Sequence, residues 1–282
     1  MAGVRLGVRG ADDWLDLLFP PTCEVCGALC GVGRQACDDC DWMTRSLAAP
    51  ACSEVGRSRC MRCASSLPNL IVELGLEGAL CAACRRNGGP RVGVTVCVGG
   101  YGDPGLRELL LRYKHAPRPG LARPLGRALA ARLAGFEAER PAGAGRARPG
   151  PLIVPVPLHF SRRFERGFDQ AVGLARAIVE AGFGELALAL RRSRAAPPQG
   201  SPFARARHRN VHGVFAVRRG AARQLAGRPL WLVDDVGTTL STVSEAARCL
   251  RGAGPEFIGL ALVARASPLN QKLGTARSVS LR

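Results

Sequence analysis

Four Cys-x-x-Cys pairs occur near the start of this 282-residue chain. Each pair directs two thiolates to one side of a tight turn, and two pairs complete the tetrahedron that Zn²⁺ prefers. Because four thiolates leave no coordination position open for water or substrate, we expect structural sites. Taken in sequence order, the pairs predict one zinc site at Cys23, Cys26, Cys37 and Cys40, and a second at Cys60, Cys63, Cys81 and Cys84.

Two other interpretations of these pairs are a thioredoxin-like redox site and buried cysteines without a role. A redox pair would need a surrounding βαβ pattern, which the sequence lacks here, and four regularly spaced pairs argue against chance. The chain has 12 cysteines, so Cys30 and Cys52 are spare thiols that could replace a ligand. Structural zinc is the interpretation that the spacing favours.

Two adjacent carboxylates, Asp234 and Asp235, follow a short apolar run at 230–233. Such a run is typical of a strand buried on both faces of a parallel sheet. Ionised carboxylates only accept hydrogen bonds, so the pair suits the hydroxyl groups of a ribose, and both are candidate catalytic residues. The loop that follows can hold a phosphate through hydroxyls, backbone N–H groups and a helix start. Its predicted ligand-binding residues are Gly237, Thr238, Thr239, Leu240, Ser241 and Thr242.

The helix after this loop is indicated by apolar residues at helical spacing, with Thr242 and Glu245 as a capping box at its start. An ordinary strand-to-helix turn with acids at its N-terminal end is the alternative interpretation of the whole stretch.

Basic residues follow other predicted elements. A strand at 152–157 opens into an arginine-rich segment that contains Arg166, and arginines beside a glycine at a strand's end suit a pyrophosphate. A long polar loop starts near Arg192 and Arg194 and runs to residue 210, and its functional interpretation is a lid over the site. Lys114, at the end of a predicted helix, would act as a mobile point charge beside a phosphate.

Residues 91–266 carry the pattern of a parallel-sheet α/β domain. Apolar runs and alternation predict strands at 92–98, 152–157, 186–190, 211–217, 230–233 and 257–263. Helical periodicity predicts helices at 106–115, 121–133, 168–179 and from 243 onward. We therefore divide the chain into a cysteine-rich module at 1–90, an α/β domain at 91–266 and a flexible tail at 267–282.

The composition points to polyanionic partners. Lys and Arg number 40 against 22 Asp and Glu, a formal net charge of +18, so nucleic acids and phosphorylated small molecules are both candidates. Nearly all of this charge is arginine, which also fits a bias in genome composition. No apolar run approaches the ~18 residues of a transmembrane helix, and acids occupy the place of a signal-peptide core. We expect a cytoplasmic protein without membrane insertion.

The acidic stretch resembles the phosphoribosyl-pyrophosphate (PRPP) motif of type I phosphoribosyltransferases. In that motif an apolar strand, two acids and a Thr-Thr-Gly turn hold the ribose and its 5′-phosphate. The strand, the acids and both threonines match, whereas Leu240 stands at the family's glycine. We expect an inward-turned Leu240 side chain to leave the loop intact if Gly237 supplies the flexibility.

Over residues 17–265 the chain resembles the ComF family of competence-associated, phosphoribosyltransferase-like proteins. The resemblance rests on the cysteine pairs, Pro155-Val156-Pro157 with Arg166-Gly167-Phe168 behind it, the Arg192-x-Arg194 loop, Asn210-Val211 and the acidic stretch. The later blocks are also similar to amidophosphoribosyltransferase, whose Pro-Val-Pro segment binds pyrophosphate and whose arginine-rich loop closes over PRPP. By this resemblance Pro155, Val156, Pro157, Arg192 and Arg194 join the ligand-binding set.

The resemblance implies a double zinc ribbon joined to a type I phosphoribosyltransferase fold, with PRPP and Mg²⁺ as ligands and DNA uptake or processing as the setting. Asp169, Ala196 and Leu240 stand where the family usually has Asn, Thr and Gly. The implied enzyme is a phosphoribosyltransferase with an altered phosphate loop. The alternatives are a non-catalytic protein that binds single-stranded DNA and one that docks competence or DNA-translocation proteins through its ribbons. Aromatic residues make up only 5% of the chain, which favours contact with phosphates over base stacking.

Overall fold

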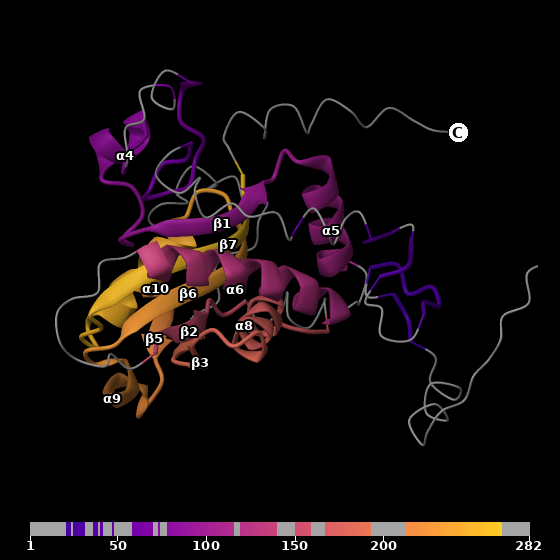
Figure 1. Ribbon diagram of the computed structural model, residues 1–282. Coiled ribbons are helices and arrows are strands. Elements are labelled where there is room, and N and C mark those ends of the chain that lie inside the picture. The colour runs from indigo at the N-terminus through magenta and orange to yellow at the C-terminus, as the bar shows by residue number, and fades with distance from the viewer. Residues whose placement is uncertain are drawn as a thin grey trace, which may run out of the picture.

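The computed structural model describes residues 21–23, 25–31, 36–38, 40–41, 47, 58–69, 73, 78–115, 119–139, 150–158, 167–192 and 213–266. Its centre is a sheet of five parallel strands in the order β1–β7–β6–β2–β3 (Figure 1). The strands are β1 (Thr95–Gly100), β2 (Leu152–Pro155), β3 (Glu185–Leu186), β6 (Pro229–Gly237) and β7 (Phe257–Arg265). The predicted class, a parallel-sheet α/β fold preceded by two groups of four cysteines, is confirmed.

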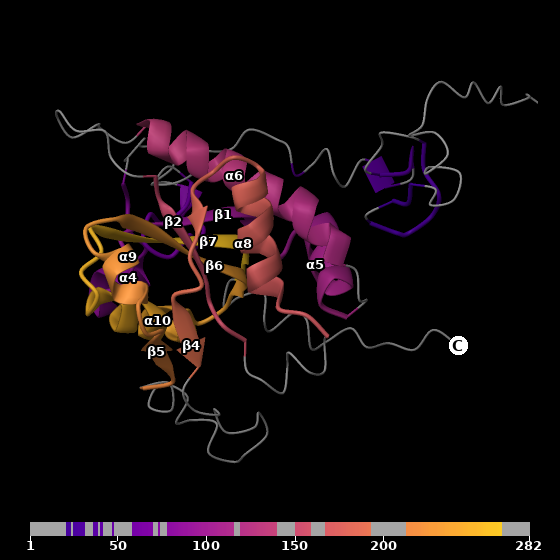
Figure 2. The ribbon, with the colours of Figure 1, turned by 90° about the horizontal axis from the view of Figure 1, so that it is seen from below.

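Continuous apolar runs in the strands explain why helices cover both faces of this sheet. Along β6, Leu230 and Leu232 belong to one core, whereas Trp231 and Val233 belong to the other. Successive side chains of a strand point to opposite faces, so one run fills two cores. The first face is covered by α10 (Ser241–Arg251), and the second by α6 (Ala122–Glu139) and α8 (Gln170–Glu180) (Figure 2).

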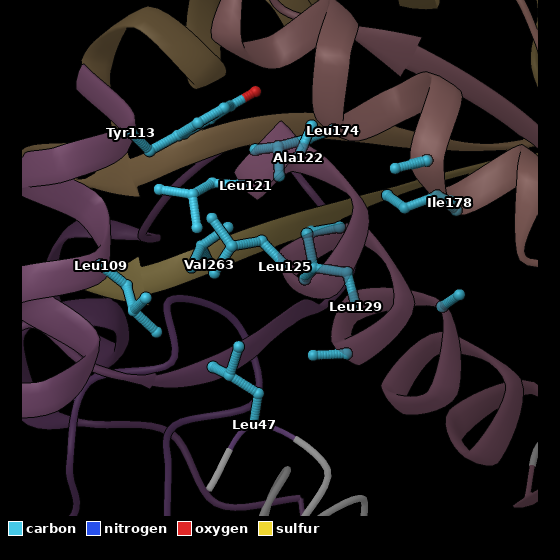
Figure 3. Packing of buried hydrophobic residues seen from close by; sticks show 14 of the residues in the cluster. Leu47, Leu109, Tyr113, Leu121, Ala122, Leu125, Leu129, Leu174, Ile178 and Val263 are labelled. Carbon is cyan, nitrogen blue, oxygen red and sulfur yellow. The ribbon is translucent and has the colours of Figure 1, made fainter. Parts of the chain in front are cut away.

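The core beneath α6 and α8 consists of fully buried aliphatic side chains. Figure 3 shows Leu125 and Leu129 of α6 near Val263 of β7, with Leu174 and Ile178 of α8 beside them. Burying each such side chain contributes about 1.5–3 kcal/mol. This packing fixes the start of α8 against the sheet, close to the ends of the strands.

The remaining elements are α4 (Ala82–Asn87), α5 (Pro104–His115), η2 (Pro119–Leu121), α9 (Ala221–Leu225) and the strands β4 (Leu190–Arg192) and β5 (Phe215–Val217). The predicted strand at 186–190 is wrong as a single element. β3 ends in the main sheet at Leu186, and β4 pairs antiparallel with β5 in a separate ribbon. The chain leaves the sheet edge between them, where Leu188 is 46% exposed.

The predicted capping box is also wrong. The N-cap of α10 is Leu240, whose side chain cannot cap the helix, and the N–H of Ser241 donates to Thr239 Oγ1 at 3.5 Å. Glu245 is instead buried, where it accepts a hydrogen bond from Gly213 N at 2.7 Å and pairs with Arg248 at 2.7 Å. The contact with Gly213, which is distant in the sequence, thus replaces the capping hydrogen bond that the local spacing predicted.

The two cysteine groups lie on different sides of the sheet domain (Figures 1 and 2). Cys23, Val25 and Leu47 belong to the core that α5 and α6 share, whereas Cys60 and Cys63 belong to the core under α10. The domain bounds at residues 90 and 266 stay a prediction, and 267–282 lie outside the described residues. Within the described ranges, none of the helices has both the length and the apolar character that a membrane crossing requires.

Candidate functional site

Cys23, Cys26, Cys37 and Cys40 form the first cysteine cluster, in which all four sulfur atoms lie within 4.8 Å of one another. The Sγ atoms of Cys26 and Cys37 are 3.5 Å apart. Four sulfurs bound about 2.3 Å from one zinc ion would stand roughly 3.8 Å apart, so this spacing fits the ion. The N–H of Cys26 donates to Cys23 Sγ at 3.4 Å, and the N–H of Ala28 donates to Cys26 Sγ at 3.4 Å. Such turns stabilise the thiolates that zinc needs.

Cys60, Cys63, Cys81 and Cys84 form the second cysteine cluster, again with all sulfurs within 4.8 Å. The Sγ atoms of Cys63 and Cys81 are 3.7 Å apart, and the N–H of Cys84 donates to Cys81 Sγ at 3.5 Å. Hydrogen bonding to the Cys60 side chain lowers the pKa of Cys63 to about 4, which favours a thiolate there. The predicted grouping in sequence order is confirmed, and both donor sets fit structural zinc. When bound, zinc would cross-link each pair of turns.

The two acids lie at the carboxyl end of β6, beside a lysine. Lys114 Nζ is 3.1 Å from Asp235 Oδ2, and both side chains are largely buried. Burial raises the pKa of Asp234 to about 8, and the charge of Asp235 adds to the rise. Asp235 N donates to Asp234 Oδ1 at 2.9 Å, and Val236 N donates to Asp235 Oδ1 at 2.6 Å. The two neighbours therefore differ in environment: Asp235 pairs with a cation, whereas burial raises the pKa of Asp234.

Tyr113 fixes the position from which Lys114 reaches this pair. The Tyr113 side chain is fully buried, and its hydroxyl donates to the carbonyl of Gln170 at 2.8 Å. Its ring centroid lies 5.4 Å from that of Phe168. Because burial raises the pKa of Tyr113, its hydroxyl keeps the proton that it donates. These contacts tie the end of α5 to the start of α8 and direct the next residue, Lys114, toward β6.

The loop between β6 and α10 bends at Leu240, which has a left-handed backbone with φ of 59°. Its side chain is 5% exposed and packs in the core under α10. Thr238 and Thr239 are exposed, and Ser241 Oγ donates to Thr239 Oγ1 at 3.1 Å. Among the described contacts, the N–H groups of Thr238, Thr239 and Leu240 have no intramolecular acceptor. The loop therefore offers donors to a ligand while its one large apolar side chain faces inward.

The prediction that Gly237 supplies the flexibility of this loop is wrong. It ends β6 outside the left-handed region, and Leu240 itself adopts the conformation that a glycine would allow. A Cβ on Gly237 would overlap Leu262 Cδ1 and would lie 2.6 Å from Leu240 Cδ2. Close packing against these side chains, rather than a turn, is what requires glycine here.

A cavity of about 430 Å³ opens beside the end of β2. Val156 is buried, and its N–H donates to the carbonyl of Val233 at 2.9 Å, which places this segment next to the acidic end of β6. Arg192 lies 5.6 Å from the centre of the Phe215 ring. The cavity lining has four arginines against one acid: Pro155, Pro157, Leu158, Asp169, Val172, Arg176, Leu188, Leu190, Arg191, Arg192 and Arg218. The excess of positive charge in this lining favours an anionic ligand.

The structure thus brings most predicted site residues to the ends of two neighbouring strands. Pro155 pairs with Val233 in the parallel register of β2 and β6, so the cavity and the acids are adjacent. Ser241 and Thr242 are half-buried at the start of α10. Arg166 and Arg194, with the lid predicted up to residue 210, lie outside the described residues, and their roles stay predictions.

Sequence reasoning missed Arg265, Arg176 and Arg218. Arg265 is a buried arginine that bonds the carbonyls of Gly237 and Cys63, and the other two line the cavity. A single arginine that ends an apolar run gives no sign of such a role, because its acceptors are far away in the sequence. Arg218 follows β5 and would have been found only by predicting the β4–β5 ribbon.

Together these features define a parallel-sheet α/β protein with two Cys₄ clusters and an arginine-lined cavity near its strand ends. Competence protein F from Haemophilus influenzae is 31% identical over 172 residues, which cover 61% of this chain and 72% of that protein. The chain belongs to the ComF family. No protein-family model matches the sequence.

The solved structures that are similar to this chain include a PRPP amidotransferase and a phosphoribosyltransferase. The glutamine PRPP amidotransferase from B. subtilis, complexed with ADP and GMP, is 19% identical with a TM-score of 0.34, covering 54% of this chain and 30% of that chain. Hypoxanthine phosphoribosyltransferase from Trypanosoma cruzi is 16% identical with a TM-score of 0.31, covering 57% and 69% of the two chains. This chain therefore spans under a third of the amidotransferase, and the family assignment rests on Competence protein F.

Proposed function

We propose that this protein binds PRPP or a related phosphoribosyl ligand at the carboxyl ends of β2 and β6. The observation that carries the proposal is the 3.1 Å pair of Lys114 and Asp235 beside a loop with three available backbone N–H groups. The carboxylates would accept hydrogen bonds from ribose hydroxyls. The N–H groups, the threonine hydroxyls and the start of α10 would hold the 5′-phosphate.

The diphosphate of the ligand would extend toward the cavity beside β2. Pro155 and Pro157 form part of its wall, and Arg192 supplies positive charge there. Mg²⁺ prefers oxygen ligands, so it would enter with the ligand and offset the charge of the diphosphate. Asp234 and Asp235 would be the carboxylates that contact that ion or the ribose.

We expect weak PRPP binding and no detectable transfer to common bases or ammonia. Catalysis of this kind is positioning and charge stabilisation, so it depends on a loop that approaches the phosphate closely. In this chain the loop keeps a Cβ at residue 240 and is anchored by the buried leucine. Binding without efficient transfer would make the protein a sensor or scaffold that responds to a phosphoribosyl ligand.

Thermal unfolding with PRPP and Mg²⁺ tests this proposal, because a ligand that prefers the native state raises the melting temperature. We expect a rise with PRPP in the wild type, a smaller one with ribose 5-phosphate, and a loss of most of the rise in Asp235→Asn. Glu139→Gln, which removes an exposed carboxylate at the end of α6, is the matched control and should behave as the wild type. An unchanged melting temperature at millimolar PRPP would rule out the site.

Single-stranded DNA is the second candidate ligand, favoured by the arginines at the cavity mouth. Arg176, Arg191 and Arg218 are all exposed there, and the chain carries a net charge of +18. Contact through phosphates would be indifferent to base sequence. The name of the relative, Competence protein F, supports a role in DNA uptake. For that role we propose that the protein is cytoplasmic and that partner proteins dock on its Cys₄ clusters.

A further inference from the structure

Arg265, the last residue of β7, is a buried guanidinium whose hydrogen bonds all go to backbone carbonyls. It is 8% exposed. Its Nε donates to Cys63 O at 2.7 Å, and its Nη1 donates to Gly237 O at 2.6 Å, to Ala266 O at 2.7 Å and to Thr238 O. Burying a charge is unfavourable unless several acceptors replace water, so this arrangement is specific for arginine.

These acceptors connect two parts of the molecule that the sequence keeps far apart. Cys63 belongs to the second cysteine cluster, whereas Gly237 ends β6 and Thr238 begins the loop that leads to α10. One hydrogen-bonded side chain therefore contacts both. Cys63 and Leu240 also belong to the same hydrophobic core, so the two parts are packed as well as hydrogen-bonded.

The turn of the second cluster is attached directly to the sheet at Thr95, the first residue of β1. Thr95 N donates to Met61 O at 2.8 Å, and Thr95 Oγ1 donates to Arg62 O at 2.7 Å. These bonds hold the turn between Cys60 and Cys63 on β1, which pairs with β7. A change in the shape of this turn therefore moves the Cys63 carbonyl relative to Arg265.

We propose that zinc in the second cysteine cluster sets the conformation of the loop at 237–241, and that Arg265 is the positioning residue that couples them. Bound zinc would hold the turn of Cys60 and Cys63 closed. The Cys63 carbonyl then fixes Arg265, and Arg265 orients the carbonyls of Gly237 and Thr238. Because a peptide unit is planar, orienting these carbonyls also aims the N–H groups of Thr238 and Thr239.

The buried cation also places positive charge beneath the loop, where solvent screens it little. If the loop binds a phosphate, as the proposed function states, that charge favours the bound state. Coupling between two sites is reciprocal, so the ligand should in turn retain zinc. The coupling of cluster to loop does not itself depend on the identity of the ligand.

Amide hydrogen exchange of the full chain, read by mass spectrometry, tests the coupling without any ligand. The N–H groups of Ser244 and Ala266 donate to Leu240 O and Gly237 O at 2.9 Å, so loop exchange is measured as the exchange of these two amides. We expect removal of zinc by a chelator to speed loop exchange by at least fivefold, while exchange in β2 and α8 stays unchanged. Cys63→Ser should produce the same change at the loop. Cys37→Ser, which disables only the first cluster, is the matched control and should leave loop exchange as in the wild type.

Arg265→Met tests the connecting residue. In this variant we expect loop exchange to be as fast as in the zinc-free wild type even when both clusters contain zinc. We also expect the chelator to cause no further increase in loop exchange. Arg62→Met is the matched control, since Arg62 lies in the turn between Cys60 and Cys63 but its side chain donates to Gly88 O at 2.7 Å instead of to the loop. If Arg265→Met fails to fold, the comparison of Cys63→Ser with Cys37→Ser still shows whether the second cluster is coupled to the loop.

Loop exchange that does not respond to zinc loss in the wild type would overturn the proposal. An increase spread evenly over all strands would overturn it too, because it would indicate general destabilisation. Release of zinc to the chelator, measured with and without PRPP and Mg²⁺, separates the two proposals. If PRPP does not slow release while loop exchange still depends on zinc, the ligand assignment fails and the coupling stands.

Discussion

At residue 240 a leucine holds a backbone conformation that usually requires glycine. A left-handed leucine is strained by about 1–2 kcal/mol, whereas losing a buried leucine side chain costs about 2–5 kcal/mol. Burial therefore outweighs strain, which explains how the loop keeps its shape without a glycine.

Replacing this leucine separates stability from ligand binding. Leu240→Gly should lower the free energy of unfolding by about 2 kcal/mol, the difference between those two effects. It should also bind PRPP tighter, by roughly fivefold for a gain near 1 kcal/mol, because glycine lets the loop backbone adjust to the phosphate. Leu240→Ala loses the same packing but keeps the Cβ, so its affinity should not rise. Calorimetric titration decides: a tightly binding wild type, with the glycine variant no better, would contradict this account.

Asp234 predicts a dependence of stability on pH that runs opposite to that of most acids. Its folded pKa is raised from 3.8 to about 8 by burial, so the native state binds a proton that the unfolded state releases. Stability contributed by the protonated group is complete below pH ~4 and is lost as the pH rises to ~8, by a few kcal/mol in order of magnitude. Urea unfolding of Asp234→Asn should show a smaller decline than the wild type over this window. An equal decline in both would show that other groups cause it.

At the scale of elements, the two cysteine clusters should behave as separable units. The purified chain should contain two zinc ions, and Cys23→Ser should contain one, because the eight ligands fall into two independent sets. The α/β domain should still unfold cooperatively in this variant, since most members of its two cores come from its own strands and helices. Metal analysis with calorimetric unfolding checks both points. Fewer than one zinc per wild-type chain would refute the assignment.

For the whole molecule, the charge of +18 predicts how DNA would bind. Affinity for single-stranded DNA should fall steeply between 50 and 200 mM salt, by roughly tenfold or more for each few phosphates contacted, and should not depend on base sequence. Arg176→Gln with Arg218→Gln should flatten the salt dependence if the cavity mouth is the contact surface. Arg123→Gln with Arg127→Gln on α6 is the matched control for a general loss of charge. Binding that does not change with ionic strength would exclude this mode.

The sequence by itself determined the features whose causes are local. A Cys-x-x-Cys pair places its thiols within one turn, so spacing alone predicted both clusters. Apolar runs such as 230–233 predicted strands buried on both faces, and the Asp234-Asp235 pair was placed at a strand end because it directly follows such a run.

Only the tertiary structure decided the features that depend on distant partners. Glu245 does not form the predicted capping box, because its carboxylate accepts a hydrogen bond from Gly213 N, 32 residues away. Lys114 was a lone charge in the sequence and became part of the acidic site because α5 ends beside β6. Arg265 and Cys63 are 202 residues apart, so no local pattern could show that one side chain contacts both a cysteine cluster and the loop at 237–241. Such contacts are fixed by packing of the whole chain, which brings together groups whose order along the sequence carries no record of their proximity.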